Sequence, residues 1–257
     1  MRRRTLFHFS QTTLRSLVRP AFHRRVSLKT NHVIELRRAS CARTETGISS
    51  AVHDISIDLA PGSITLFTGE AGCGKNLILR LLGLLELPDS GEVYFQHHAV
   101  SKMNGNERMN LRDTMCGYVF PTAFLLPGFS VMENIAMPLF KVLNMQPIDA
   151  QTRTEMLIEH VGLEQFGTTK IDKLSPGLRL RVGLARALGA LPPLLIVEEP
   201  DRIIQEVELD AFRTLLHQSA LEFNCAIAMS AAPSLPTFPR ERRVECVAGK
   251  IVCDVLP

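Results

Sequence analysis

A glycine-rich segment, residues 69–76 (Gly-Glu-Ala-Gly-Cys-Gly-Lys-Asn), restricts the fold of this chain more than any other feature. It follows the apolar run 64–67, which is typical of a buried strand, and it precedes residues 77–82, whose composition is typical of a helix. A strand, a glycine-rich loop, a lysine and a helix form the layout of a phosphate-binding loop. The glycines let successive backbone N–H groups face an anion, and the helix N-terminus adds the positive end of its dipole.

We expect a nucleotide to bind along this loop, with Lys75 reaching its terminal phosphates. The predicted nucleotide-binding residues are Gly69, Glu70, Ala71, Gly72, Cys73, Gly74, Lys75, Asn76 and Leu77. Asn76 stands where this loop usually has a serine or threonine whose hydroxyl ligates Mg²⁺. Its amide oxygen is a candidate replacement. The motif has only three fixed positions, so a glycine turn without a ligand is the alternative.

A second apolar run, residues 194–197, predicts a buried parallel strand that ends at Glu198 and Glu199. P-loop nucleoside triphosphatases place an acid associated with Mg²⁺ at the end of such a strand. Glu198 is therefore a candidate metal ligand, and Glu199 is the predicted catalytic residue that polarises the attacking water. Helices alternating with buried strands predict an α/β protein with a mixed sheet core.

The charge of the chain is divided unevenly. Residues 1–30 contain eight Lys and Arg and no acid, whereas the remainder has 21 basic and 26 acidic residues. The basic tail has the composition of an organelle transit peptide and would also suit a tail on anionic lipid. A disordered extension or a misassigned start codon is the third alternative. Because the rest of the chain is acidic, we expect no nucleic-acid partner.

Other features of the sequence favour a globular domain in a reducing compartment. Six cysteines occur without a CxxC pair, which argues against a disulfide framework or a metal site. No apolar run reaches the length of a membrane span. We expect a flexible extension over residues 1–32 and one domain over 33–257, in which residues 122–190 form an inserted helical subdomain. The polar segment 101–113 predicts a loop with a short helix.

From about residue 33 onward the chain resembles the ATP-binding subunit of ABC transporters, and in particular the lipoprotein-release and macrolide-export branch. The stretches that carry this resemblance, in order, are Gly69–Gly83, Leu87–Val93, Phe124–Leu139, Leu174–Leu188 and Leu194–Pro200. The resemblance implies a P-loop fold of the ABC ATPase type, ATP and Mg²⁺ as cofactors, and a place on the cytoplasmic face of the inner or plasma membrane. It implies two partners, a transmembrane permease and a second cassette subunit, identical or different. Ser175 and Gly177, in the signature segment, would contact the ATP of that second subunit.

Several positions depart from the family pattern. The adenine-stacking aromatic is expected near Arg43, yet no aromatic residue occurs between Phe22 and Phe67. The other departures are Asn76 for a hydroxyl, Pro121 for a glutamine, Pro176 and Leu178 for a glycine and a glutamine of the signature, Glu198 for an aspartate, Gln205 for an aspartate and Ala231 for a histidine. Pro121 supplies neither a side-chain oxygen nor a backbone donor.

These departures predict a protein that binds ATP with reduced affinity and hydrolyses it slowly or not at all, since phosphoryl transfer depends on metal and positioning groups. Three hypotheses follow: an active transport ATPase, a pseudo-ATPase that supports a competent partner, and a decaying gene product. Compensating residues, such as Glu198 for the metal, would favour the first.

Overall fold

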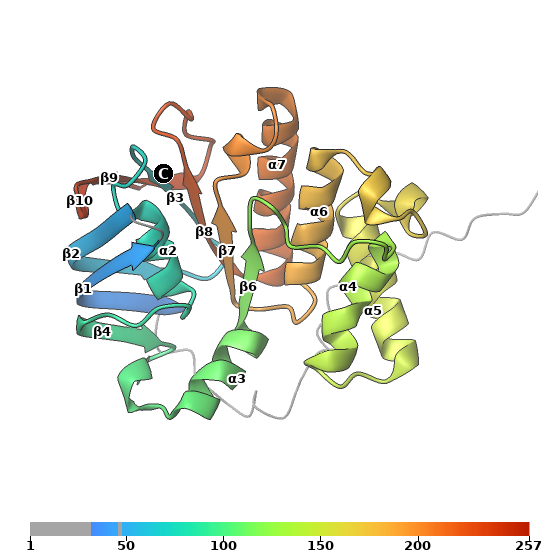
Figure 1. Cartoon of the computed structure of the whole chain (residues 1–257), viewed down its shortest axis with the longest axis horizontal. Coiled ribbons are helices and arrows are strands. Elements are labelled where there is room, and N and C mark those ends of the chain that lie inside the picture. Colours follow the sequence, from blue (N-terminus) through green and yellow to red (C-terminus); the bar gives the residue numbers. More distant parts are fainter. Residues whose placement is uncertain (1–31, 46–47, 257) are drawn as a thin grey trace, which may run out of the picture. The chain divides into compact units, whose positions relative to one another are not determined.

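A six-stranded sheet forms the centre of the part of the chain that the structure describes, residues 32–45 and 48–256 of this computed structural model (Figure 1). Its strand order is β10-β9-β3-β8-β7-β6; β9 and β10 are antiparallel and the other neighbours are parallel. The strands are β3 (Ile64–Thr68), β6 (Cys116–Val119), β7 (Leu194–Glu198), β8 (Ala226–Ala231), β9 (Glu241–Val247) and β10 (Lys250–Val255). The interpretations of the basic tail concern residues 1–31, which lie outside this range.

A four-stranded antiparallel sheet has the order β2-β1-β4-β5. Its strands are β1 (Ile34–Glu45), β2 (Ile48–Leu59), β4 (Ser90–Phe95) and β5 (His98–Ala99). Strands β1 and β2 are longer than the sequence pattern predicts. Their pairing shifts register around Ala39, between Leu36 and Cys41, and such bulges interrupt the alternation by which a strand is identified in a sequence.

In the described residues, six α-helices accompany the sheets. They are α2 (Lys75–Leu82), α3 (Gly105–Met115), α4 (Val131–Lys141), α5 (Pro147–His160), α6 (Pro176–Ala187) and α7 (Glu206–Phe223). Helix α3 replaces most of the predicted polar loop, because Asn104 and Glu107 form a capping box that satisfies backbone donors at its N-terminus. Helices α4, α5 and α6 lie between β6 and β7 in the chain and gather on one side of Figure 1.

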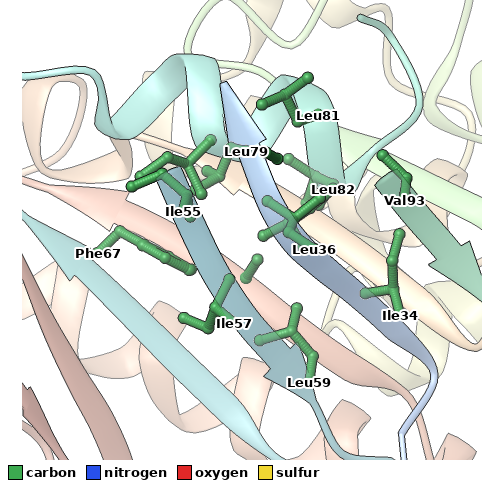
Figure 2. Packing of buried hydrophobic residues seen from close by; sticks show 14 of the residues in the cluster. Ile34, Leu36, Ile55, Ile57, Leu59, Phe67, Leu79, Leu81, Leu82 and Val93 are labelled. Carbon is green, nitrogen blue, oxygen red and sulfur yellow. The ribbon is translucent and has the colours of Figure 1, made fainter. Parts of the chain in front are cut away.

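Apolar side chains pack on both faces of the six-stranded sheet. On one face, Leu79 and Leu82 of α2 pack with Leu36 of β1, Ile55 of β2 and Phe67 of β3, all buried (Figure 2). On the other face, apolar residues of α6 and α7 form one buried cluster with alternate residues of β3, β7 and β8, including Leu66 and Met229, and residues of α4 and α5 join this cluster. Burying one such side chain contributes roughly 1.5–3 kcal/mol. The ends of the parallel strands are therefore held rigidly between two apolar layers.

None of the helices in the described ranges has both the length and the apolar character needed to cross a bilayer.

The cysteines provide a test of this packing. All six are free thiols; five are buried and Cys253 is exposed. Burial raises the pKa of Cys116, Cys225 and Cys246 to about 12, so roughly one molecule in 10⁴ would carry each thiolate near pH 8. We expect one thiol per native chain to react rapidly with a chromogenic disulfide reagent. Cys253→Ser is expected to remove that reaction, whereas several fast thiols in the native protein would contradict the packing.

Candidate functional site

Three parallel strands of the six-stranded sheet end at the same edge. Thr68 at the end of β3 pairs with Ala231 of β8, and Glu198 at the end of β7 pairs with Ser230 of β8. The carboxyl ends of parallel strands are where α/β sheets bind ligands. The predicted phosphate loop follows β3 directly, so the fold places it beside the acids that follow β7.

The glycines of the loop have backbone conformations that other residues avoid. Gly69, Gly72 and Gly74 have φ values of +153°, +80° and +99°. Gly74 is the N-cap of α2, so the loop leads directly into the helix N-terminus. A methyl group on Gly69 would approach Cys73 Sγ to 2.6 Å and would also collide with the carbonyl oxygen of Cys246. The chain thus provides the helix N-terminus and the curved backbone that hold a phosphate group.

Lys75 is buried, with an exposed fraction of 4%. Its Nζ donates to the carbonyl oxygens of Gly69 at 3.0 Å and Glu70 at 3.4 Å, and it pairs with Glu199 Oε1 at 3.1 Å. These three partners use all three ammonium protons. A phosphate that binds Lys75 therefore has to replace one of them, and the predicted catalytic Glu199 is one of the three.

Glu199 has a left-handed backbone, with φ 40° and ψ 55°. Its N–H donates to the carbonyl oxygen of Ser230 at 3.0 Å and lies 3.3 Å from Ser230 Oγ. Its second carboxylate oxygen, Oε2, pairs with Arg202 Nη1 at 3.0 Å. One buried carboxylate thus holds Lys75 and Arg202 together. The sequence reasoning missed Arg202, although an acid and a base three residues apart in a helical turn are a recognisable signal.

Asn76 and Glu198 are the predicted metal ligands. Asn76 Oδ1 is buried and has no hydrogen-bond partner, so it is one oxygen ligand of the kind that Mg²⁺ prefers. No described residues bring together three His, Cys, Asp or Glu side chains that could hold a metal. The residues present therefore fit a Mg²⁺ ion held mostly by phosphate oxygens, with Asn76 as its protein ligand. When bound, such an ion would neutralise phosphate charge.

The other predicted loop residues have structural positions. Leu77 is buried in the core beneath the loop, and Glu70 and Ala71 are exposed at its tip. Cys73 is buried; its N–H donates to Glu70 O at 3.2 Å, and its carbonyl oxygen accepts from Gly249 N–H at 2.9 Å. The β9–β10 turn therefore supports the phosphate loop, a contact that local sequence patterns could not reveal.

The signature residues lie at the start of α6. Ser175 is the N-cap, and its Oγ accepts from Leu178 N–H at 3.3 Å. Pro176 is the first residue of the helix, where the missing N–H of proline does no harm. Gly177 is buried against Glu208, whose carboxylate would lie 3.0 Å from a methyl group at this position. Among the described residues, Ser175 and Gly177 form no hydrogen bond with the phosphate loop of the same chain.

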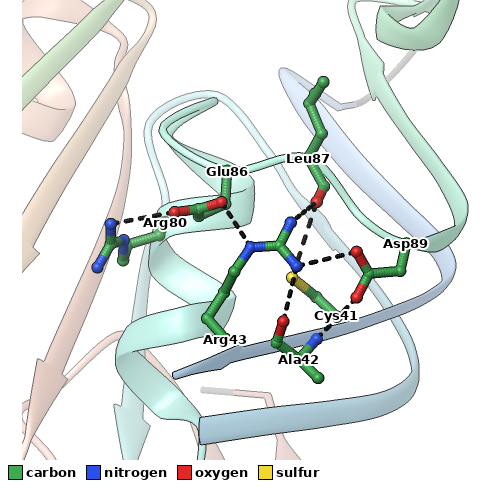
Figure 3. Close-up of polar contacts among 7 residues, drawn as sticks. All are labelled: Cys41, Ala42, Arg43, Arg80, Glu86, Leu87 and Asp89. Atoms are coloured by element: carbon green, nitrogen blue, oxygen red, sulfur yellow. Dashed lines mark hydrogen bonds and ion pairs between the residues drawn. The ribbon is translucent and has the colours of Figure 1, made fainter. Parts of the chain in front are cut away.

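Arg43, at the position where the family resemblance implies an aromatic residue, is fully engaged elsewhere (Figure 3). Its guanidinium contacts Glu86 Oε2 at 2.9 Å, Asp89 Oδ1 at 2.9 Å and the carbonyl oxygen of Leu87 at 2.8 Å. Glu86, and then Asp89, raise the pKa of Arg43, and Arg43 lowers the pKa of Asp89. Arg43 thus fastens β1 to the segment after α2.

Three further residues that differ from the family pattern lie at separate positions in the structure. Ala231, in place of a histidine, is fully buried in β8. Pro121 follows β6 by two residues, and Gln205 is the N-cap of α7 without a capping side-chain bond. Asp201 was not predicted; its Oδ2 accepts from Ala232 N–H at 2.9 Å and fixes the turn after Glu199 to the end of β8.

Comparisons with known proteins agree with this architecture. The chain is similar to a dimeric, post-hydrolysis state of the ATP-binding cassette MJ0796 bound to ADP and Pi, with 21% identity, a TM-score of 0.75, and coverage of 87% of this chain and 98% of that chain. It is also similar to cbiO1 from Clostridium perfringens, part of the ABC transporter complex cbiONQ, with 18% identity, a TM-score of 0.80, and coverage of 89% and 90%. These likenesses confirm the predicted fold: a P-loop ABC ATPase with a mixed sheet and an inserted helical part.

The family follows from the sequence itself. A family model described as ABC transporter matches residues 52–202, which is more than half of the chain. This match extends from β2 through the phosphate loop and α6 to the turn that holds Arg202, so it includes every predicted site residue. The chain therefore belongs to the ABC transporter family and carries its ATP-binding cassette.

Proposed function

We propose that this protein is the ATP-binding subunit of an ABC transporter, that it docks on a membrane permease to energise transport, and that its ATP hydrolysis is impaired. The observation that carries the proposal is the phosphate loop, with three glycines at positive φ and Lys75 facing Glu199 at 3.1 Å. The nearest branch by motif is the lipoprotein-release and macrolide-export branch. The transported substrate is set by the permease.

The proposed assembly has two cassettes. ATP lies between the phosphate loop of one and Ser175 and Gly177 of the other, and Asn76 and Glu198 are the candidate ligands of Mg²⁺. We place the protein on the cytoplasmic face of the inner or plasma membrane, without a nucleic-acid partner. In this proposal residues 1–32 are an extension, and residues 33–257 are the domain, with a helical subdomain over about 122–190.

The surface around α4 and α5 supports docking on a permease. Large apolar side chains are exposed there, a feature that marks interaction sites on globular proteins. They are Phe124, Phe129, Phe140, Val142 and Ile148. Phe124 and Ile148 are the most exposed of these, at 66% and 69%. The permease-facing segment of the cassette is therefore proposed to lie between residues 124 and 148.

A second candidate function is a pseudo-ATPase that supports a competent cassette in an asymmetric dimer. The contacts of Glu199 favour it, because both carboxylate oxygens already hold cations. Glu199 has to release one of them before it can orient a water. A partner cassette with intact motifs, co-purified with this protein and a permease, would support this function over the first.

ATP binding is the first test. At about ten times its Kd, ATP is expected to raise the melting temperature by about 3–6 °C, through mass action on a domain of this size. The measurement is thermal unfolding with and without millimolar ATP, with AMP as the control that lacks the terminal phosphates. A melting temperature that does not change at millimolar ATP would contradict the proposal that this protein binds ATP.

Hydrolysis is assayed on the same protein, together with its partners and Mg²⁺. If the altered residues impair turnover, Asn76→Ser together with Pro121→Gln should raise it, and Glu199→Gln should abolish what remains. A turnover that Glu199→Gln leaves intact excludes Glu199 as the catalytic residue.

A further inference from the structure

Two cations meet on one buried carboxylate beside the phosphate loop. Glu199 Oε1 is 3.1 Å from Lys75 Nζ, and Glu199 Oε2 is 3.0 Å from Arg202 Nη1. The side chains of Lys75 and Glu199 have exposed fractions of 5% and 7%, whereas that of Arg202 is 59% exposed. Arg202 is therefore a solvent-exposed cation that contacts the buried carboxylate of the loop site.

The backbone of Arg202 is fixed although its side chain is exposed. Its N–H donates to the carbonyl oxygen of Glu199 at 3.2 Å, within the short 3-10 helix Pro200–Arg202. Asp201, in the same turn, accepts from Ala232 N–H at 2.9 Å. The backbone of Arg202 is thus held at the carboxyl edge of the sheet. Its side chain is mostly exposed, and Lys75 stays beside Glu199 as a second cation, so the carboxylate keeps a counter-ion when the guanidinium turns to another partner.

The negative charges of a bound nucleoside triphosphate require more than one positive group beside the loop. A nucleoside triphosphate brings several negative charges to the loop, and Asn76, the neutral residue that fits Mg²⁺, adds no charge of its own. Lys75 already pairs with Glu199. A guanidinium binds phosphate oxygens with two parallel hydrogen bonds and keeps its charge at all ordinary pH values.

We propose that Arg202 is a second phosphate-binding cation of this site, and that it gives the chain a mode of nucleoside polyphosphate binding that does not require a divalent metal. The inference rests on the proposed function, because it concerns the same loop. In the structure Glu199 holds both cations in place. When a terminal phosphate binds, the guanidinium of Arg202 leaves Glu199 Oε2 and pairs with the phosphate oxygens. Arg202 then supplies the positive charge that a metal ion supplies in other nucleotide sites.

The test is ATP affinity in excess EDTA and in excess Mg²⁺, measured by calorimetry on the full chain. The wild type is expected to bind with a Kd that differs by less than about threefold between the two conditions. Arg202→Ala is expected to weaken binding about tenfold or more in EDTA, and less in Mg²⁺, where the metal replaces the lost charge. Arg202→Lys should retain part of the affinity, and AMP binding should not respond to Arg202→Ala.

Arg37→Ala is the matched control. Arg37 is 56% exposed and pairs with Glu35 at 2.6 Å on β1, so its loss removes an arginine that is as exposed as Arg202, together with its ion pair, away from the loop. It is expected to bind ATP as the wild type does. If Arg202→Ala binds ATP in EDTA as tightly as the wild type, or more tightly, Arg202 is only an ion-pair partner and the inference is wrong.

The same measurements distinguish a failure of the Arg202 role from a failure of ATP binding itself. A wild type that binds ATP only with Mg²⁺ overturns the role of Arg202 and leaves ATP binding in place. A wild type that binds ATP in neither condition overturns both.

Discussion

Glu241→Gln is expected to lower the free energy of unfolding by about 3–5 kcal/mol, because it removes the buried counter-ion of Arg213 and leaves only Asp210, a more exposed acid at 3.8 Å. The two side chains are each 1% exposed, with Arg213 Nη2 at 2.6 Å and Nε at 3.2 Å from the carboxylate oxygens of Glu241. The guanidinium also lies 4.7 Å from the centre of the Phe238 ring and donates to the carbonyl oxygen of Pro236. Chemical denaturation of the purified chain measures the loss.

A second ion pair gives the matched control. Arg242 and Asp254 lie 2.6 Å apart, but they are 17% and 36% exposed. Asp254→Asn is therefore expected to lower stability by less than about 1 kcal/mol. The double change Arg213→Met with Glu241→Leu should recover most of the loss, since apolar replacements of a buried pair are often neutral. A Glu241→Gln protein within about 1 kcal/mol of the wild type would contradict the buried-charge argument.

Gly69→Ala is expected to destabilise the chain by about 3–5 kcal/mol, which combines backbone strain at positive φ with overpacking. The added methyl group would lie 2.6 Å from Cys73 Sγ and against the backbone oxygen of Cys246, which cannot move without shifting β9. The same variant should lose the thermal shift produced by ATP, because the loop can no longer curve around phosphate.

Gly72→Ala separates strain from crowding. Gly72 also has positive φ, +80°, yet no atom lies within 4 Å of an added methyl group. Its expected cost is about 1–2 kcal/mol, that of the left-handed conformation alone. Equal destabilisation by the two substitutions would show that contact with Cys73 and β9 contributes nothing, and the measurement is again the midpoint of denaturation.

The parts that sequence predicted well are those in which neighbouring residues decide the structure. The phosphate loop, α2 and the strand that ends at Glu198 consist of consecutive residues, and local patterns locate them to within one or two positions. The position of Pro176 could not be decided locally, because a proline is acceptable both in a loop and at the first position of a helix. The length of β1 was underestimated because the bulges near Ala39 interrupt the alternation of apolar and polar residues.

The site itself could be predicted only in part, because its contacts join distant segments. The pairing of Glu199 with Arg202 is local, yet its meeting with Lys75 depends on the order β3-β8-β7, which no short pattern encodes. The same is true of Arg43, whose partners Glu86 and Asp89 follow α2. Where the family resemblance implied a base-stacking residue, tertiary ion pairs instead gave Arg43 a structural role.

The position of β3 has a consequence for how the protein is made. Both hydrogen-bonded neighbours of β3, namely β8 and β9, come from the last third of the chain, and Gly249 supports the loop at Cys73. Translation is slow relative to local folding, and domains form as the chain emerges. The nascent chain therefore exposes an unpaired β3 and an unfinished loop until the segment that includes Gly249 has left the ribosome. The ability to bind a nucleotide is therefore acquired only after the segment that includes Gly249 has emerged, although the loop residues 69–77 are synthesised well before it.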